Sequence, residues 1–443
     1  MSENRDNSYS AEGQRRVFAS QYSRSRGISA YRKRRRMSLA TRIVVALFLL
    51  LIVGGAAVLF GRQFFYYLPF GYRPPTQGEA AAKPDDEEPI PTVQPAQVSV
   101  LCAGDVVAHG SVVDSGRKEG TEAYNFVHLF APLRGEVESF DVRTLSQETA
   151  LAGKNYGFGS FDRLNAPQDL GRAEIADGFN VIMRATDHTL DLGRDALHNE
   201  LSWWHQEQSS IPVLGVAEPD PEANPGIPDY VSDVYLYEKD GFKVALLNHS
   251  WGIAEDDYSV VAALYEDKVS SDVSRARELG ADVIVAFPHW GAENSTELSE
   301  EETNFARLYS DLGVDVVVGT NPRVLQQVEV LENGEGHKTL CFYSLGCLTS
   351  SLQGDNLLGG LAEFSLVRDD KGVCSVADAT LKPVVTHRAT GDAYSTYLLR
   401  EYSDELAQSS WEPGQTREYY NERCAEILGD GYDRDACELR IEV

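Results

Sequence analysis

The chain has 443 residues, with 40 Lys and Arg against 68 Asp and Glu, and a formal net charge of −28. A hydrophobic content of 42% and an aromatic content of 10% are enough for a large core, which excludes disorder over most of the length. The charge is unevenly distributed, because residues 1–42 carry 11 basic and 3 acidic side chains, whereas residues 43–443 carry 29 and 65, a net of −36. We expect no nucleic-acid partner, because so acidic a part would repel a phosphate backbone.

An apolar segment separates the two charge regions. Ile43–Gly61 holds nineteen residues without a charged or strongly polar side chain. A helix of this length is about 28 Å long and can cross a bilayer, and basic flanking residues mark its cytoplasmic side. We therefore predict a basic cytoplasmic tail (1–42), a transmembrane anchor (43–61) and an extracytoplasmic main domain. A cleaved signal peptide is the alternative, but the leader is long for one, and no clean A-x-A site follows.

The segment after the predicted anchor is rich in proline. Residues 68–96 hold seven of the eighteen prolines, together with the acidic run Asp85–Glu88. Proline-rich chains are extended and semi-rigid. Residues 62–96 are therefore predicted to form a stalk between the membrane and the main domain.

From residue 97 onward, short apolar runs alternate with amphipathic ones. Strands are predicted at Val98–Ala103, Val142–Leu145, Asn180–Ala185, Asp282–Phe287 and Asp315–Gly319. Helices are predicted at Arg194–Gln208, Glu266–Leu279 and Glu300–Leu312. A hairpin is predicted from Val234–Tyr237 and Phe242–Asn248, with its turn at Asp240-Gly241. This alternation favours an α/β sheet with parallel pairs. The later strands follow one another directly, at Gln327–Leu331, Lys338–Ser344, Leu361–Val367 and Val373–Leu381. That half should be more antiparallel, and residues 385–443 are predicted to form a helical appendage.

All six cysteines lie beyond the predicted anchor, in a compartment where disulfides persist. Cys424 and Cys437 are close in sequence, and we expect a local bridge between them. The other four cannot be paired from the sequence, and buried free thiols remain an alternative for them.

Polar side chains follow the predicted strands, where ligands bind in open α/β sheets. They are Asp105 and His109, Glu148, Asp187 and His188, His289 and Glu293, and Asn321 and Arg323. One such residue alone is usually a cap or turn residue, but their recurrence at successive strand ends favours a site. Carboxylate and imidazole donors suit a divalent cation that activates a water.

These segments resemble the CapA-type poly-γ-glutamate capsule biosynthesis family, over about Val98–Val384. Two family motifs are intact, Gly-Asp at Gly104-Asp105 and His-Trp-Gly-x-Glu at His289–Glu293. Two altered motifs are Ser146-Gln147-Glu148, where the family has Asn-Leu-Glu, and Ala185–Gly193, where it has Ala-Asn-Asn-His-x-x-Asp-x-Gly. Two more are Gly319–Gln326, where the family has Gly-Thr-His-Pro-His-Val-Leu-Gln, and Tyr343–Leu348, where it has Tyr-Ser-Leu-Gly-Asn-Phe. The resemblance implies an α/β fold of the calcineurin-like metallophosphoesterase class, a sandwich of mixed β-sheets flanked by helices. This domain would cover residues 97–384 and be preceded by the transmembrane helix.

The resemblance also implies roles for the strand-end residues. One metal would be held by Asp105, Glu148 and His109, with Glu148 bridging to a second metal held by Asp187, His289 and the residue at Asn321. However, Asn321 and Arg323 replace two histidines of the family, and a guanidinium cannot ligate a metal. Arg323 could itself neutralise the acids, which leaves one divalent metal (Mn, Zn or Mg) or none.

The remaining candidates have less defined roles. His188 is a candidate general acid, or alternatively a hydrogen-bonded structural histidine. Asn321, Glu293 and His249, which ends a hairpin strand, are candidate substrate contacts.

Two functions of different class follow from the resemblance. The altered motifs favour a tethered component of capsule or cell-envelope polymer biosynthesis or export, with a weakened or absent hydrolase site. The alternative is an active metal-dependent hydrolase that uses Asp105, Glu148, Asp187 and His289. The expected partners are the membrane, the polymer and its synthesis machinery.

Overall fold

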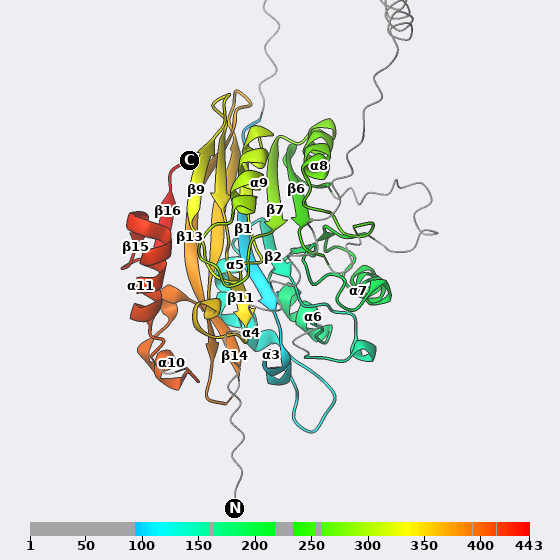
Figure 1. The fold of residues 1–443 in the computed structure, drawn as a ribbon, viewed down its shortest axis with the longest axis vertical. Coiled ribbons are helices and arrows are strands. Elements are labelled where there is room, and N and C mark those ends of the chain that lie inside the picture. Colours follow the sequence, from blue (N-terminus) through cyan, green and yellow to red (C-terminus); the bar gives the residue numbers. More distant parts are fainter. Residues whose placement is uncertain (1–93, 160–163, 218–233, 254–257, 392, 413) are drawn as a thin grey trace, which may run out of the picture. The chain divides into compact units, whose positions relative to one another are not determined.

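The computed structural model describes residues 94–159, 164–217, 234–253, 258–391, 393–412 and 414–443 (Figure 1). The predicted cytoplasmic tail, the transmembrane anchor and all but the last residues of the stalk lie outside these ranges. Within them, no helix combines the length and the apolar character that crossing a bilayer requires.

The larger of two sheets is built around a long N-terminal strand and contains ten of the described strands in mixed orientation. The strands are β1 (Ala96–Val107), β2 (Val142–Gln147), β3 (Val181–Met183), β4 (Val213–Leu214), β11 (Cys347–Ser350), β12 (Leu358–Arg368), β13 (Cys374–Arg388), β14 (Tyr394–Leu398), β15 (Tyr432–Asp433) and β16 (Glu438–Ile441). β1 is parallel to β2 and β11 but antiparallel to β12, and the pairs from β12 to β16 are antiparallel. The predicted shift toward antiparallel pairing in the later part of the chain is seen here.

The second sheet contains six of the described strands in the order β5-β6-β7-β8-β10-β9. They are β5 (Val234–Lys239), β6 (Phe242–Ser250), β7 (Val283–His289), β8 (Val316–Val318), β9 (Val328–Glu332) and β10 (Lys338–Phe342). The inner pairs from β6 to β10 are parallel, and β5 and β9 are antiparallel edges. Asp240 and Gly241 join β5 to β6 with φ angles of 54° and 67°, as a type I′ turn requires.

The two sheets pack face to face, and strand alternation decides which side chains lie between them. Val100 of β1 packs in one buried cluster with Leu246 of β6 and Val285 of β7. The next residue of β1, Leu101, faces the other side. Successive residues of a strand point to opposite faces, so each sheet contributes one face to this shared core.

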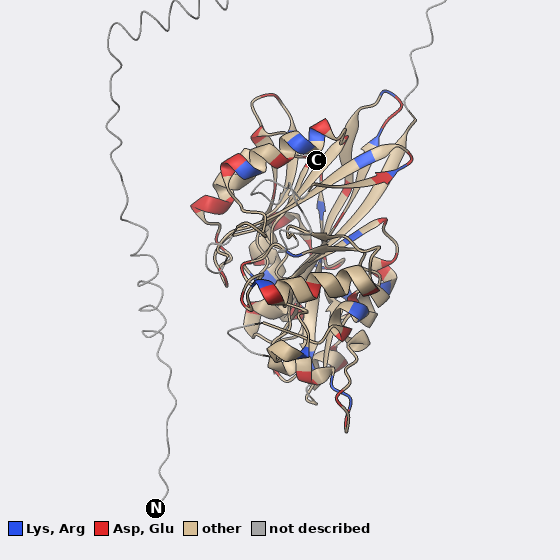
Figure 2. Ribbon diagram, turned by 90° about the vertical axis from the view of Figure 1, so that its right-hand side faces the viewer, with Lys and Arg blue, Asp and Glu red and all other residues tan. Residues whose placement is uncertain are grey.

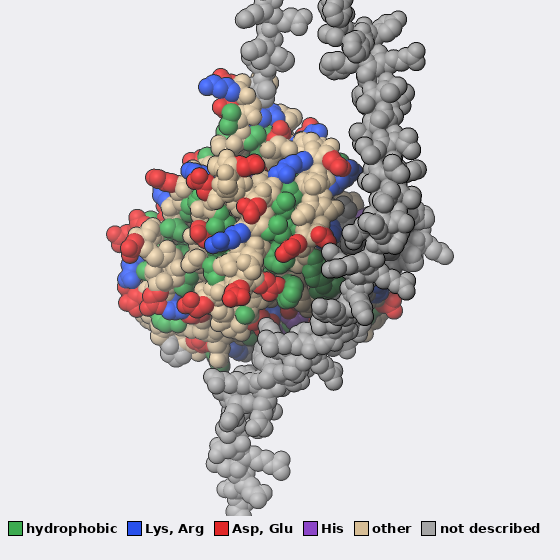
Figure 3. Space-filling model, turned by 45° about the horizontal axis from the view of Figure 1, so that its top comes forward, with side chains coloured by type: hydrophobic (Ala, Val, Ile, Leu, Met, Phe, Trp, Pro, Cys, Tyr) green, Lys and Arg blue, Asp and Glu red, His purple; other side chains and the backbone are tan. Residues whose placement is uncertain are grey.

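Helices lie around the two sheets (Figure 1). They are α3 (Gly110–Ser115), α4 (Val127–Phe130), α5 (Arg134–Val137), α6 (Asp169–Ala176), α7 (Arg194–Glu207), α8 (Glu266–Glu278), α9 (Glu300–Asp311), α10 (Asp404–Ser409) and α11 (Arg417–Leu428). α6 and α7 pack on the outside of the larger sheet, and α8 and α9 on the outside of the second. Figure 2 shows charged residues along the helices, and acidic side chains are spread over the face seen in Figure 3.

The C-terminal segment differs from the expected helical appendage. Residues 385–443 form α10 and α11, but they also form β14, β15 and β16 of the larger sheet. β13 crosses the expected boundary at residue 384 and pairs with both β14 and β16. These strands have two to five residues, and strands this short are specified by their pairing partners rather than by a local pattern.

The expected bridge between Cys424 and Cys437 is not formed. All six cysteines are free thiols, and both of these are buried. Burial raises the pKa of Cys424 to about 12. A buried and protonated thiol is a poor nucleophile for disulfide exchange, which is consistent with the reduced state.

Candidate functional site

The strand-end acids of the two sheets converge on one cluster. Ligand atoms of Asp105 on β1, Glu148 after β2 and His289 at the end of β7 all lie within 4.8 Å of one another. Glu148 forms a second such group with Asp187 and His188, which follow β3. We call these five residues, together with Asn321 and Arg323, the acid cluster.

Asp105 is fully buried and only partly hydrogen-bonded. Its Oδ2 accepts a hydrogen bond from the backbone N–H of Asn321 at 3.0 Å, whereas Oδ1 has no hydrogen-bond partner among the described residues and lies 3.8 Å from Nδ1 of His289. Burial and the charge of Glu148 raise the pKa of Asp105 to about 7, although His289 opposes the shift. The preceding Gly104 is required here, because a Cβ atom would lie 2.0 Å from the carbonyl oxygen of Gly346.

His289 and Asp187 form a charge pair between the two sheets. Nε2 of His289 lies 3.1 Å from Oδ1 of Asp187, and Nδ1 lies 2.9 Å from the hydroxyl of Thr320. Burial opposes both charges, yet the hydrogen bond between the two side chains raises the pKa of His289 and lowers the pKa of Asp187. The aspartate and the imidazolium therefore stabilise each other.

Arg323 places a guanidinium inside the acid cluster. Its Nη2 and Nε donate to Oε2 and Oε1 of Glu148 at 2.7 and 3.3 Å, and Nη2 lies 3.3 Å from Oε1 of Glu293. Arg323 is 6% exposed and Glu148 is fully buried. A buried, two-pronged guanidinium–carboxylate pair is a strong and directional interaction.

The loop after β8 adopts an unusual backbone to present this side chain. Asn321 and Arg323 have φ angles of 92° and 61°, in the left-handed region that non-glycine residues rarely adopt. Such conformations cost of the order of 1–3 kcal/mol each and persist where surrounding contacts enforce them. Here, the contacts of Arg323 with Glu148 and of Asn321 with Asp105 provide that enforcement.

His188 contacts both an acid and the guanidinium. Its Nδ1 lies 2.6 Å from Oδ2 of Asp191, and its Nε2 lies 2.7 Å from Nη2 of Arg323. Burial lowers the pKa of His188, but the hydrogen bond to Asp191 and the charges of Asp187 and Glu148 outweigh burial and raise it to about 9. The contact with Arg323 requires an unprotonated Nε2, whereas the raised pKa favours the protonated ring at neutral pH, so a protonated His188 and the guanidinium compete for this position.

Asn321 offers a fixed oxygen to the acid cluster. Its Nδ2 donates to the carbonyl oxygens of Trp290 and Gly291, both at 2.9 Å. These bonds fix the amide so that Oδ1 is the free end, and this oxygen is buried without a partner in the described part of the chain. Two buried oxygens without hydrogen-bond partners, on Asp105 and Asn321, would be candidate ligands of one small divalent cation, together with His289 once its ring has lost a proton.

Two further candidate residues lie at the border of this centre. His109 is buried, its Nδ1 lies 3.0 Å from the hydroxyl of Ser351, and burial and the charges of Arg323 and His188 lower its pKa to about 4. Glu293 is exposed and contacts Arg323 from the rim.

His249 does not reach the acid cluster, contrary to the expected substrate contact. Its Nε2 lies 3.0 Å from Asp272 of α8, and its Nδ1 accepts from the hydroxyl of Tyr309 of α9 at 3.0 Å. Alternation along β6 explains this position, because Asn248 faces the inner side and His249 faces the outer helices.

Two positioning residues were not among the candidates from the sequence. Asp191 holds the ring of His188, and Thr320 holds the ring of His289. Partners of this kind fix the orientation and tautomer of an imidazole. For Asp191, the His188-x-x-Asp191 spacing was a sequence signal that could have identified it. For Thr320, the only signal was its place in the motif Gly319–Gln326.

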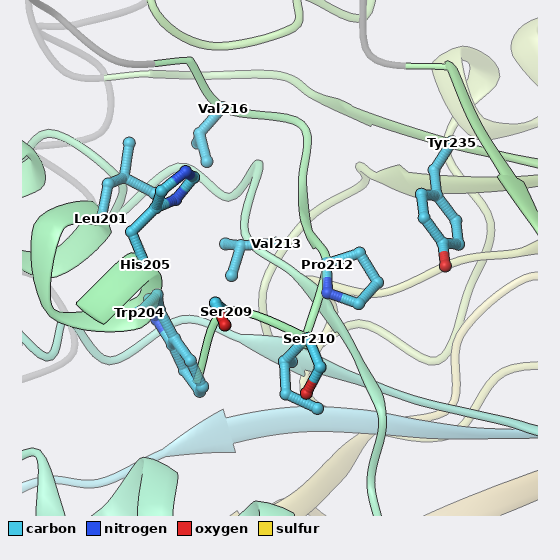
Figure 4. A pocket seen from close by; sticks show the side chains of 10 residues that line it. Leu201, Trp204, His205, Ser209, Ser210, Pro212, Val213, Val216 and Tyr235 are labelled. Atoms are coloured by element: carbon cyan, nitrogen blue, oxygen red, sulfur yellow. The ribbon is translucent and has the colours of Figure 1, made fainter. Parts of the chain in front are cut away.

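A separate hollow lies between α7, the segment 209–216 and β5 (Figure 4). It has a volume of about 340 Å³, and Trp204, His205 and Tyr235 are among its lining residues. No member of the acid cluster lines it. His205 therefore belongs to this hollow and not to the candidate site.

The fold and site define a two-sheet α/β protein with a carboxylate–imidazole cluster at its strand ends. The chain belongs to the bacterial capsule synthesis protein PGA_cap family, whose model matches residues 99–350. It is 24% identical over 262 residues to "Capsule biosynthesis protein CapA" of Bacillus anthracis, covering 56% of this chain and 59% of that protein. It is 26% identical over 172 residues to "PGA biosynthesis protein CapA" of Bacillus subtilis (strain 168), covering 38% of this chain and 42% of that protein. The matched segments thus span less than two thirds of either relative.

Solved structures show a more distant likeness. Haemophilus influenzae NAD nucleotidase (NadN) matches with a TM-score of 0.42 at 11% identity, covering 75% of this chain and 67% of that one. The calcineurin-like phosphoesterase YfkN from Bacillus subtilis matches with a TM-score of 0.38 at 12% identity, covering 75% and 98%. Both TM-scores lie below 0.5, and we infer no function from them.

Proposed function

We propose that the chain is a membrane-anchored, extracytoplasmic protein of capsule or cell-envelope polymer biosynthesis or export, in which Arg323 takes the place of one metal ion. The family match and the names of the two Bacillus relatives support the role in polymer synthesis. The apolar segment Ile43–Gly61 and its basic flank support the anchor. From the family match we also assign the two-sheet sandwich to the calcineurin-like metallophosphoesterase class.

The observation that carries the proposal is the buried pair of Arg323 and Glu148. A guanidinium stays protonated in proteins and cannot ligate a metal, so both oxygens of Glu148 are occupied by a fixed cation. Glu148 would otherwise bridge two metals by resemblance to the family. With its oxygens taken, the cluster has room for one cation at most, and a hydrolase that needs two is not supported.

A metal-dependent hydrolase is the second candidate, and the unpartnered oxygens favour it. Asp105, Asn321 and the unprotonated form of His289 would hold one Mn, Zn or Mg ion, which would polarise a substrate oxygen or a water when bound. Asp187 would keep His289 oriented, and His188 could hold or release a proton at Nε2 once Arg323 moves away.

A metal titration of the full-length protein, purified in mild detergent, separates these functions. We expect the native protein to bind at most one equivalent of Mn²⁺ and the double variant Asn321→His/Arg323→His to bind a second. Arg423→His is the matched control, because Arg423 pairs with Asp355 and is not a member of the acid cluster. Tight binding of two equivalents by the native protein would show that Arg323 does not replace a metal.

A cellular test addresses the role itself. Deleting the gene should abolish the envelope polymer, and the native gene should restore it. If the cluster is not catalytic, the isosteric variant Asp105→Asn should also restore the polymer. A folded Asp105→Asn protein that fails to do so would support the hydrolase instead.

A further inference from the structure

The guanidinium of Arg323 has one edge that is filled and one that is open. Its Nε and Nη2 pair with the two oxygens of Glu148, which fills the first edge. Nη2 also lies 2.7 Å from Nε2 of His188 and 3.3 Å from Oε1 of Glu293. Nη1 forms no hydrogen bond with the residues that the structure describes. The second edge, which Nη1 and Nη2 form, therefore still has donors for a ligand.

Neighbouring groups fix the direction of this open edge. The carbonyl oxygen of Arg323 accepts hydrogen bonds from Nδ2 of Asn356 at 3.2 Å and from Sγ of Cys347 at 3.5 Å. Arg323 is 6% exposed, so its side chain has little room for other rotamers. A binding group that is held in one orientation before the ligand arrives loses less conformational entropy on binding. The open edge is thus a preorganised anion-binding group.

Glu293 places a carboxylate at the open edge, but fills it only in part. Its Oε1 contacts Nη2 alone, and its side chain is 42% exposed. Asn356 links the loops that carry the two side chains, because its Nδ2 also donates to Oδ1 of Asn294, the neighbour of Glu293, at 2.8 Å. Exposed ion pairs contribute little free energy, because water and salt screen them. A ligand carboxylate can therefore replace that of Glu293 with little loss.

The chemistry of the open edge favours a carboxylate over other anions. A guanidinium edge and a carboxylate are both planar, and two parallel N–H···O bonds join them, as Glu148 shows on the first edge. Exchanging the carboxylate of Glu293 for another leaves the number of acids at the guanidinium unchanged. A phosphate group would bring additional negative charge close to Glu148 and Asp187, which repel it.

We infer that the Nη1–Nη2 edge of Arg323 is a carboxylate-binding subsite that Glu293 occupies in the free protein. A carboxylate on a unit of the envelope polymer displaces Glu293 when the polymer binds. The inference rests on the proposed function for the source of that carboxylate. It gives Arg323 a second role beside neutralising Glu148, and it makes Glu293 an internal competitor of the polymer.

Calorimetric titration of the full-length protein, in mild detergent and at physiological salt concentration, tests the subsite. The probes are a linear γ-linked glutamate tetramer, the same tetramer with every carboxylate converted to a carboxamide, and inorganic phosphate. We expect the native protein to bind the carboxylate tetramer about tenfold more tightly than either of the other probes, because only this tetramer can form the two-pronged pair.

Glu293→Gln and Glu297→Gln are a matched pair of variants. Each removes one exposed carboxylate from the segment between β7 and α9, but among the described residues only Glu293 of the two contacts Arg323. Glu293→Gln should therefore bind the carboxylate tetramer about threefold more tightly than Glu297→Gln does. Arg323→Lys keeps the positive charge but loses the planar edge, and it should weaken binding about tenfold relative to the native protein.

Three results would overturn the inference: the two tetramers bind equally or not at all, phosphate binds more tightly than the carboxylate tetramer, or Glu293→Gln and Glu297→Gln bind that tetramer equally. The last comparison does not depend on whether Arg323→Lys folds. A native protein that binds at most one equivalent of Mn²⁺ and is needed for the polymer, yet does not prefer the carboxylate tetramer, would retain the proposed function and reject the subsite alone.

Discussion

Glu174 of α6 is a buried carboxyl without a compensating charge among the described residues. Neither of its oxygens has a hydrogen-bond partner there. The nearby Glu200 takes the guanidinium of Arg184, which donates from Nε and Nη2 to its two oxygens at 2.9 and 3.2 Å. Burial and the charge of Glu200 raise the pKa of Glu174 from 4.5 to about 8.

This shift makes the free energy of unfolding depend on pH. Between about pH 4.5 and pH 8 the unfolded chain releases the proton of Glu174 while the folded protein keeps it, so stability falls as the pH rises through this window. In the native protein, this carboxyl should lower the free energy of unfolding by on the order of 3 kcal/mol between pH 5 and pH 8.5. The substitution Glu174→Gln should abolish this decrease, which denaturant unfolding at the two pH values would measure. The exposed Glu119→Gln is the control and should keep the native pH dependence. An unchanged dependence in Glu174→Gln would show that the carboxyl is ionised in the folded state.

At this scale the sequence predicted which residue types gather at the strand ends, but not how each side chain points. Asp105, Glu148, Asp187, His289 and Arg323 could be found because each follows a strand, and parallel strands in one sheet share an edge. The direction of His249 could not be found, because it depends on which face of β6 meets α8 and α9. The bond from Arg323 to Glu148 was a hypothesis from charge alone, and its geometry depends on the left-handed backbone after β8.

At the scale of elements, the hairpin of β5 and β6 depends on its two-residue turn. Gly241 has a φ of 67°, and a Cβ atom added there would meet no other atom within 4 Å, so a substitution is opposed by backbone strain alone. Gly241→Ala should destabilise the protein by about 1 kcal/mol in thermal or urea unfolding. Gly334→Ala, in the turn between β9 and β10, is the matched control, because its surroundings are equally open and its φ is not positive. Equal effects of the two substitutions would contradict a role of backbone conformation in this turn.

The helices α7, α8 and α9 and the strands of the second sheet lie within a few residues of their predicted positions, because each has a strong apolar period and clear ends. The start of α9 shows why: Ser299 accepts from the backbone of Glu302, and the Glu302 carboxylate accepts from Ser299 in return. β14, β15 and β16 were not predicted, because they are short and gain their stability from pairing with β13 and with one another.

At the scale of the whole molecule, the sequence indicated mixed sheets but could not divide the strands between them. β7 and β3 both end at the acid cluster, although they belong to different sheets, and only their packing across the shared core brings His289 to Asp187. The candidate site is thus a property of the sandwich and not of either sheet. A substitution in the shared core that moves the two sheets apart should therefore separate His289 from Asp187, even though neither residue is changed.

The charge difference between the two ends of the chain gives the last prediction. Residues 1–42 have 11 basic and 3 acidic side chains, so the positive-inside rule predicts that they lie in the cytoplasm and that residues 62–443 lie outside. In a Cys374→Ser background, which removes the one native thiol that is not buried, a membrane-impermeant maleimide should label Ala81→Cys in intact cells. It should label Ser8→Cys only after the membrane is permeabilised. Labelling of Ser8→Cys in intact cells would reverse the orientation, and loss of residue 8 from the mature chain would show a cleaved leader in place of the anchor.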